Sequence, residues 1–239
     1  MRPKIFVEDS YEAMSKRAAS IFAGEVKLKP SGVFGFATGS TPVKMYEELV
    51  AQNIDFANIT TFNLDEYYPI KKESAASYHY FMDKHLFEYI KVKATNIPCG
   101  QAKDPDAECA AYEQKITHSG GIDMQILGLG HNGHIGFNEP GDFFPEKTHC
   151  VKLAESTIQA NSRHFAKGEE MPAYALTMGI GTIMLARKIL LLISGESKSE
   201  ITYRFLHDNI SPKIPATILR LHSCVTLVMD KEAAQKCQI

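Results

Sequence analysis

The chain has 239 residues, of which 44% are hydrophobic, and this is enough for one large domain with a substantial buried core. Lysine and arginine number 26 against 28 aspartates and glutamates, and neither sign forms a long run, which excludes the charge pattern of a nucleic-acid or membrane-surface binder. We therefore predict a single domain, residues 1–239, that binds a small molecule.

The cysteines and the apolar stretches indicate the compartment. The five cysteines are scattered, odd in number and free of CxxC spacing, unlike a disulfide framework or a zinc finger. They are Cys99, Cys109, Cys150, Cys224 and Cys237. The start of the chain lacks a signal-peptide pattern, and the longest apolar stretch, residues 189–193, is too short to span a bilayer. We expect a soluble protein with reduced thiols in the cytoplasm.

The first half of the chain alternates short apolar strands with amphipathic helices. Strands are predicted at 5–7, 33–37 and 59–64, and helices at 11–23, 43–50, 78–87 and 106–117. Pro42 suits the first helical position, with Thr41 as the expected N-cap. Gly120 and Gly121 are expected to end the fourth helix.

The second half begins with a strand at 124–127 that breaks into a loop of glycines and polar residues, 128–141. Residues 142–172 are polar and mixed, and they predict a mobile lid with a helix near 156–165. The remaining elements are a helix at 175–187, strands at 188–194, 217–221 and 224–229, and a helix starting within 195–198.

Alternating strands and helices of this length predict an α/β fold, with a mostly parallel sheet covered on both faces. Functional sites in such folds lie at the carboxyl ends of the strands. Four polar segments follow predicted strands and are therefore expected to meet in one crevice: 38–42, 65–69, 128–141 and 194–198.

Two of these segments suit an anion. The TGSTP segment at 38–42 combines glycine, hydroxyl groups and a helix start, and the SGESK segment at 194–198 adds an ammonium group at a second helix start. An arginine in the predicted lid could close over the same phosphate. Ordinary capped turns and surface cations are the alternative explanation. The candidate phosphate ligands are Thr38, Gly39, Ser40, Thr41, Arg163 and Lys198.

The polar loop contains GLGHNG at 128–133, which matches the dinucleotide fingerprint GxGxxG. That fingerprint must open directly into a helix and be followed by an acidic residue about 20 positions later, and neither condition holds here. A metal site built on His131, His134 and Glu139 is disfavoured, because their spacing in a glycine loop does not fix a tetrahedral geometry. We therefore expect neither a nicotinamide cofactor nor a catalytic metal.

Proton transfer is a better role for His134, since imidazole titrates near neutral pH and Asn132 and Glu139 are close enough in sequence to orient it. A hydrogen-bonded structural histidine is the alternative. Asp65 and Glu66 form the second acid/base candidate. Adjacent side chains on a strand point to opposite sides, so at most one of these two carboxylates is expected to face the crevice.

The chain resembles the glucosamine-6-phosphate deaminases along essentially its whole length. The segments that carry the resemblance are ATGSTP, TFNLDEY, SYHYFM, ILGLGHNGHIGFNEPG, ANSRHF, ALTMGIGTI, SGESKSE and IPATIL. The resemblance implies a Rossmann-like three-layer α/β/α domain that converts glucosamine 6-phosphate and water to fructose 6-phosphate and ammonia without cofactor or metal. Whether such a protein is a monomer or a homo-oligomer stays open.

The resemblance also implies a role for each site residue. His134 opens the sugar ring with Asn132 and Glu139 holding it, Asp65 moves a proton from C2 to C1, and the six candidate phosphate ligands grip the phosphate. Asn132 stands where several members carry Asp, so it can hydrogen-bond His134 but brings no charge. The alternatives are a 6-phosphogluconolactonase-like hydrolase and a non-catalytic sugar-phosphate sensor.

Overall fold

The computed structural model describes residues 3–155, 157–158, 162, 165 and 170–237. Its main feature is a seven-stranded sheet in the order β1-β10-β9-β6-β2-β3-β5, in which every neighbouring pair is parallel. The strands are β1 (Lys4–Glu8), β2 (Val33–Phe36), β3 (Thr60–Asn63), β5 (Ala94–Asn96), β6 (Met124–Gly128), β9 (Ile189–Ile193) and β10 (Val225–Asp230). The predicted α/β class is confirmed.

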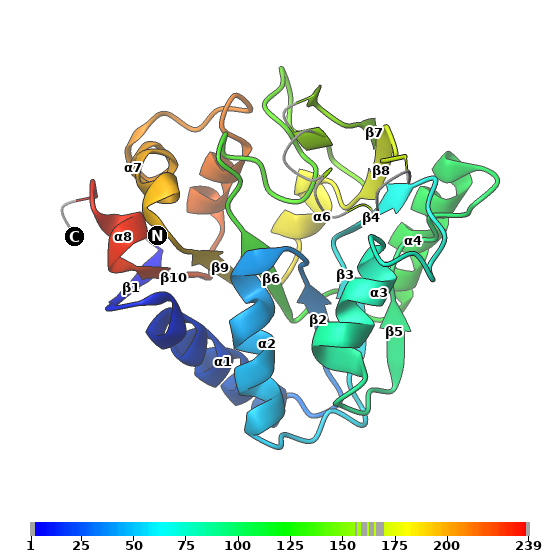
Figure 1. Cartoon of the computed structure of the whole chain (residues 1–239), viewed down its shortest axis with the longest axis horizontal. Helices are drawn as coiled ribbons and strands as arrows, with labels where there is room; N and C mark the ends of the chain where they lie inside the picture. Colours follow the sequence, from blue (N-terminus) through cyan, green and yellow to red (C-terminus); the bar gives the residue numbers. More distant parts are fainter. Residues whose placement is uncertain (1–2, 156, 159–161, 163–164, 166–169, 238–239) are drawn as a thin grey trace.

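Helices cover both faces of this sheet (Figure 1). The longer ones are α1 (Tyr11–Leu28), α2 (Ser40–Ala51), α4 (Pro105–His118) and α7 (Ser199–His207). On β2, Phe34 and Phe36 contact Phe22 of α1. Phe62 is the register partner of Gly35, which lies between them, so it points to the opposite face, where it packs on Tyr112 of α4. The sheet is therefore the middle of three layers.

A second, three-stranded antiparallel sheet lies beside the main one (Figure 1). Its order is β4 (Asp65–Tyr68), β8 (Tyr174–Thr177) and β7 (His149–Lys152). The sequence did not predict this sheet, and the predicted helix at 175–187 is wrong over its first part. Residues 174–177 instead form β8, which pairs with β4 on one side and β7 on the other, and the helix α6 (Ile180–Met184) begins only after Gly179.

The other elements are short. They are α3 (Tyr78–Met82), which continues into the π-helical turn η1 (Asp83–Phe87), the 3-10 helices η3 (Glu196–Lys198) and η4 (Pro215–Leu221), and α8 (Lys231–Ala234). The predicted strand at 217–221 is wrong, because Pro215 starts a 3-10 helix there and the last strand forms only from Val225. All five cysteines are free thiols.

The predicted lid is only partly described. β7 lies within it, and the helix predicted near 156–165 falls largely outside the described residues. Both the lid and the single-domain organisation therefore stay predictions. Among the described residues, no helix is long and apolar enough to cross a membrane.

Candidate active site

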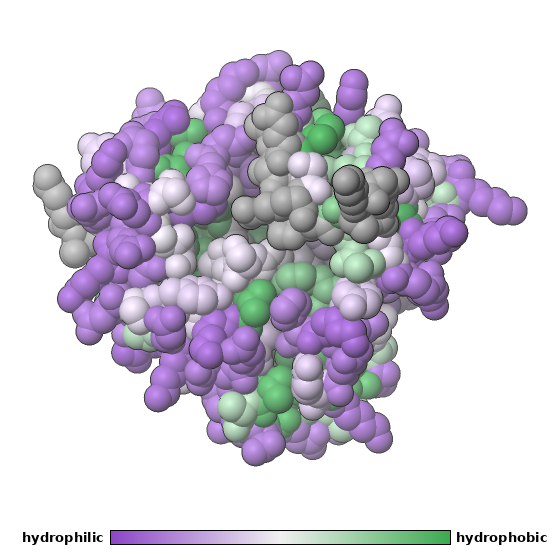
Figure 2. Space-filling model, viewed as in Figure 1, coloured by the Kyte–Doolittle hydropathy of each residue, from purple (hydrophilic) through white to green (hydrophobic). Residues whose placement is uncertain are grey.

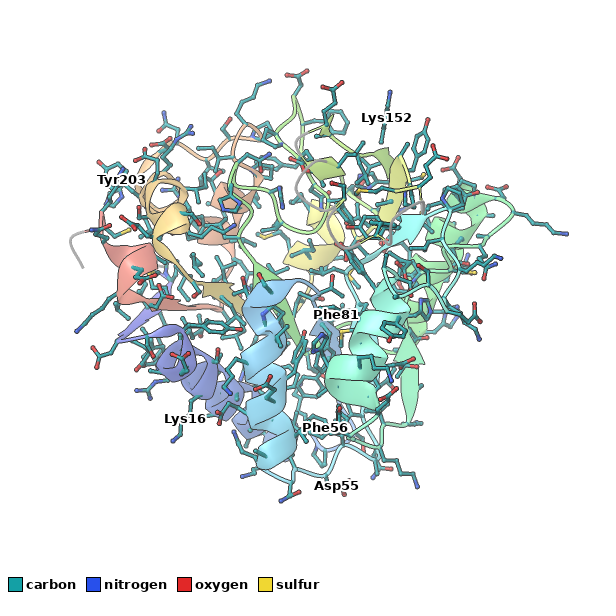
Figure 3. All side chains as sticks on the ribbon, in the orientation of Figure 1. Lys16, Asp55, Phe56, Phe81, Lys152 and Tyr203 are labelled. Carbon is teal, nitrogen blue, oxygen red and sulfur yellow. The ribbon has the colours of Figure 1, made fainter. Side chains whose placement is uncertain are left out.

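A cavity of about 830 Å³ lies at the carboxyl ends of the central strands. All four polar segments expected to meet in a crevice contribute to its lining, together with residues of α3 and η1. Figure 2 shows this face as largely hydrophilic, with less polar residues gathered in its middle above α2 and α3. Phe81, a lining residue on α3, lies in the middle of this face on the side of α3 next to α2 (Figure 3).

The segment after β2 presents backbone N–H groups to the cavity. Gly39 has φ +95°, a conformation that favours glycine, and it is the N-cap of α2 without any side-chain cap. The prediction that Thr41 is the N-cap is wrong, because the helix already begins at Ser40. Without a capping side chain, the first N–H groups of α2 suit an anion, and Thr38, Gly39, Ser40 and Thr41 all line the cavity.

Lys198 supplies a cation on the neighbouring loop. Its Nζ donates to the carbonyl of Leu129 at 2.7 Å and lies 3.3 Å from Nδ1 of His131, whose Nε2 is 3.2 Å from Ser197 Oγ. Burial lowers the pKa of Lys198 to about 8. A partly desolvated ammonium is strongly attracted to an incoming phosphate, whose negative charge favours the protonated form of the lysine. Arg163, the other predicted cation, lies outside the described residues.

Asp230 holds the Lys198 loop in place. Gly195 adopts φ +93°, and its N–H donates to both carboxylate oxygens of Asp230, at 3.1 and 3.0 Å. The Ser194 hydroxyl donates to the same carboxylate at 2.5 Å, and Ala233 N at 2.8 Å. The carboxylate therefore ties the end of β9 to the end of β10. Sequence reasoning missed this residue, which looks like a simple N-cap of α8.

His134 stands in a hydrogen-bonded chain on the other side of the cavity. Its Nδ1 is 2.8 Å from Asn132 Oδ1 and 3.3 Å from Glu139 Oε1. Asn132 Nδ2 donates to Glu139 Oε2 at 2.5 Å, and Thr157 Oγ1 donates to Oε1 at 2.6 Å. These contacts direct Nδ1 into the protein, so the other ring nitrogen, Nε2, is left for a ligand.

Glu139 is held as a carboxylate. Burial by itself raises its pKa, but hydrogen bonding and charge attraction from His134, together with hydrogen bonds from Thr157 and Asn132, bring the pKa down to about 2. A fixed negative charge near Nδ1 stabilises a positive imidazole, and that is the state a histidine reaches when it takes up a proton in general acid/base catalysis.

Asp65 and Glu66 divide as expected, with Asp65 lining the cavity and Glu66 turned away from it. Glu66 accepts hydrogen bonds from the N–H groups of Tyr78 and His79 at the start of α3. Burial, with the nearby charge of Glu66 second, raises the pKa of Asp65 to about 8. A desolvated carboxyl group with a pKa near neutrality is suited to proton abstraction from carbon.

An aromatic wall closes the cavity beside Asp65, and sequence reasoning did not assign it. Tyr67, Tyr78 and Phe137 lie within 6.1 Å of one another between ring centroids, and the rings of Tyr78 and Phe137 are stacked. These rings exclude water from Asp65, which explains its desolvation. Among the described residues, no group of three or more His, Cys, Asp or Glu side chains could hold a metal ion.

The site therefore combines an anion pocket with two separate proton-transfer groups, His134 and Asp65. This arrangement suits a phosphorylated small molecule that needs acid/base chemistry at two of its atoms.

Comparison with known proteins gives a consistent result. The family model for glucosamine-6-phosphate isomerases/6-phosphogluconolactonase matches residues 8–228. A glucosamine-6-phosphate deaminase of Alkaliphilus oremlandii is 52% identical over 236 residues, covering 96% of this chain and 98% of the relative. One of Clostridium botulinum is 48% identical over 242 residues, covering 99% of both chains.

Solved structures agree with the sequence matches. A monomeric glucosamine-6-phosphate deaminase aligns with a TM-score of 0.93 at 46% identity, covering 98% of this chain and 99% of that one. A 6-phosphogluconolactonase from Trypanosoma cruzi aligns with a TM-score of 0.82 at 20% identity, covering 100% of this chain and 98% of that one, which indicates a shared fold alone.

Proposed function

The chain belongs to the family of glucosamine-6-phosphate isomerases and 6-phosphogluconolactonases, and we propose that it is a glucosamine-6-phosphate deaminase. The reaction converts glucosamine 6-phosphate and water to fructose 6-phosphate and ammonia. The observation that carries the proposal is the presence of Asp65 and the His134–Glu139 pair in the same cavity as two anion-suited loops.

The phosphate binds first in this mechanism. The N–H groups and hydroxyls of residues 38–41 and the ammonium of Lys198 hold the phosphate, and Arg163 is proposed to complete the pocket. This remote binding energy places the sugar ring between His134 and Asp65.

Ring opening is the role of His134. The imidazole transfers the proton of the C1 hydroxyl to the ring oxygen, so that the C1–O5 bond breaks and the open-chain aldehyde forms. Glu139 stabilises the protonated imidazole, while Asn132 fixes the orientation of the ring through Nδ1.

Isomerisation is the role of Asp65. Its carboxylate takes the proton from C2 while a proton from solvent adds to the aldehyde oxygen, giving an enolamine, and it then returns the C2 proton to C1. The product carries an imine at C2, and addition of water there followed by loss of ammonia gives fructose 6-phosphate. The aromatic wall keeps the carboxylate basic by limiting its hydration.

A single assay tests the proposal. Ammonia and fructose 6-phosphate are measured together after addition of glucosamine 6-phosphate, and ammonia alone is measured in parallel with galactosamine 6-phosphate, whose ketose product would be the C4 epimer, tagatose 6-phosphate. We expect both products in equal amounts, and the larger rate with glucosamine 6-phosphate. Hydrolysis of 6-phosphogluconolactone without release of ammonia from either amino sugar would instead support the lactonase alternative, and binding without turnover would support a sensor.

The monomeric relative supports a monomer for this chain as well. Light scattering at working concentration is the direct measurement. A mass near 26.6 kDa is the expected result.

A further inference from the structure

Thr177 lies beside the proposed base. It is fully buried on β8 and is the direct register partner of Asp65 in the β4–β8 pair. Opposed residues of an antiparallel pair project to the same face, with Cβ atoms about 5 Å apart. A Cβ atom on Gly136 would lie 2.8 Å from Thr177 Oγ1 and 3.5 Å from Asp65 Oδ2. The Thr177 hydroxyl and the Asp65 carboxylate therefore both lie next to Gly136 of the polar loop.

The same hydroxyl holds the polar loop. The N–H of Phe137 donates to Thr177 Oγ1 at 3.1 Å. The next residue, Asn138, adds two hydrogen bonds. Its Nδ2 donates to the carbonyl of Met178 at 2.8 Å and to that of Ile135 at 2.9 Å. Ile135 directly follows His134 in the chain. β8 is therefore joined to Asp65 through the strand ladder and to the His134 loop through a side chain.

The contact to the loop is the main interaction of this hydroxyl. Its other neighbour, the carbonyl of Met178, is 3.5 Å away, which is long for a hydrogen bond. The N–H of Phe137 is buried, and without Oγ1 it would lose its acceptor, so the loop would shift to find another one. Such a shift changes the distance between the loop and Asp65.

We propose that Thr177 is a positioning residue that sets the distance between Asp65 and the loop carrying His134. The inference rests on the proposed deaminase reaction, in which His134 acts on the oxygens bonded to C1 and Asp65 then acts on C2 and C1 of the same sugar. A displacement of about 1 Å between such groups can cost about 100-fold in rate.

Thr177→Val tests the proposal, because valine keeps the branched shape and removes the hydroxyl. We expect kcat with glucosamine 6-phosphate to fall about 10- to 100-fold. KM should change less than about threefold, since the phosphate ligands lie on other loops. The isotope effect with substrate deuterated at C2 should rise, because proton abstraction becomes slower relative to the other steps. Thr177→Ser should restore kcat to within about threefold of the unmodified protein.

Thr182→Val is the matched control. It also removes a buried hydroxyl, one that donates to Glu113 Oε1 at 2.6 Å on α4 and does not line the cavity. We expect a lower melting temperature with unchanged kcat. If Thr177→Val does not fold, Thr177→Cys takes its place, because a thiol fills the site but accepts hydrogen bonds poorly.

Three outcomes overturn the inference: an unchanged kcat in the folded variant, a serine variant as slow as the valine variant, or an equal loss of kcat in Thr182→Val. If the unmodified protein releases ammonia while Thr177→Val is unaffected, this inference alone is wrong. If the unmodified protein releases no ammonia, the proposed function and this inference are wrong together.

Discussion

Two consecutive carboxyl groups have different environments because strand side chains alternate. Glu66 is fully buried and accepts backbone N–H groups at the start of α3, where the helix dipole favours a negative charge. Asp65 faces the cavity, next to aromatic rings, and burial together with Glu66 raises its pKa to about 8. The fold therefore holds the proposed base at a cost in stability.

Asp65→Asn should abolish turnover while leaving substrate binding intact, and it should also stabilise the protein. The raised pKa of Asp65 means that its contribution to stability is present below the unfolded value of about 4 and is lost as the pH rises to about 8. Asparagine does not titrate, so the variant does not lose this stability as the pH rises. The melting temperature of the variant should therefore exceed that of the unmodified protein by a margin that grows from pH 5 to pH 8.

The control for this measurement is Asp142→Asn, which removes an exposed carboxylate paired with Lys213. We expect no pH-dependent change in its melting temperature beyond about 1 °C. Near-normal ammonia release by Asp65→Asn would exclude Asp65 as the base.

His134→Gln should slow ring opening without affecting the later steps. Glutamine keeps a hydrogen-bonding group near Asn132 but cannot transfer a proton at neutral pH. The rate with the closed-ring substrate should then be limited by spontaneous opening, and the isotope effect at C2 should fall towards unity. A single-turnover measurement with deuterated substrate checks this. An isotope effect as large as that of the unmodified protein would show that His134 does not act in ring opening.

Among the structural elements, the loop between β9 and α7 shows how a phosphate ligand is positioned. Lys198 lies at the end of a single 3-10 turn, which has little stability of its own, and Asp230 of the next strand fixes that turn through Ser194 and Gly195. The carboxylate is buried and acts through Lys198, without lining the cavity.

Asp230→Asn should therefore weaken binding of the phosphorylated sugar. The amide offers one acceptor oxygen where the carboxylate offers two, so it cannot satisfy both the Ser194 hydroxyl, which donates to Oδ2, and the Ala233 N–H, which donates to Oδ1, and one side of the anchor is lost. We expect KM for glucosamine 6-phosphate to rise about five- to tenfold with kcat within about twofold. Unphosphorylated glucosamine is the control substrate, and an equal loss with both sugars would contradict this role.

At the scale of the whole molecule, the site exists because successive strands are added first on one side of β2 and then on the other, although all of them run parallel. β3 and β5 lie on one side of β2, and β6, β9 and β10 lie on the other. The loops after β2 and β6 therefore diverge at the centre of the sheet and leave a crevice, as in other doubly wound folds. The small β4–β8–β7 sheet closes this crevice on the side of Asp65.

The shifted pKa values of Asp65 and Lys198 predict a narrow pH optimum for kcat/KM. Asp65 must be ionised, so kcat/KM should rise with pH up to about 8. Lys198, whose pKa is lowered to about 8, loses its charge above that pH and with it its attraction for phosphate, so kcat/KM should fall again. The profile from pH 5 to pH 10 is the measurement.

Lys198→Arg separates the two limbs of this profile. Arginine stays charged over the whole range, so the alkaline limb should disappear while the acid limb remains. The overall kcat/KM should be lower, because the larger guanidinium group cannot reproduce the contact to Leu129. An acid limb near pH 4 would mean that Asp65 is not desolvated in the working enzyme.

The sequence by itself determined the elements whose signals are local. Strands with continuous apolar runs, such as β9 and β10, and loops rich in glycine after β2, β6 and β9 follow from residue type and spacing. The motif residues around Asp65 and His134 were found in the same way. The resemblance of these motifs to one enzyme family then indicated the reaction.

Only the tertiary structure decided which segments pair and which side chains meet. Residues 174–177 have no strand signal of their own and become β8 because β4 and β7 offer backbone partners on both sides. For the same reason the desolvation of Asp65, the anchoring of Lys198 by Asp230 and the position of Thr177 opposite Asp65 could not be predicted. The last two depend on contacts between residues more than 30 positions apart, and the wall beside Asp65 includes Phe137 of the later polar loop. Such contacts leave no periodic pattern in the sequence.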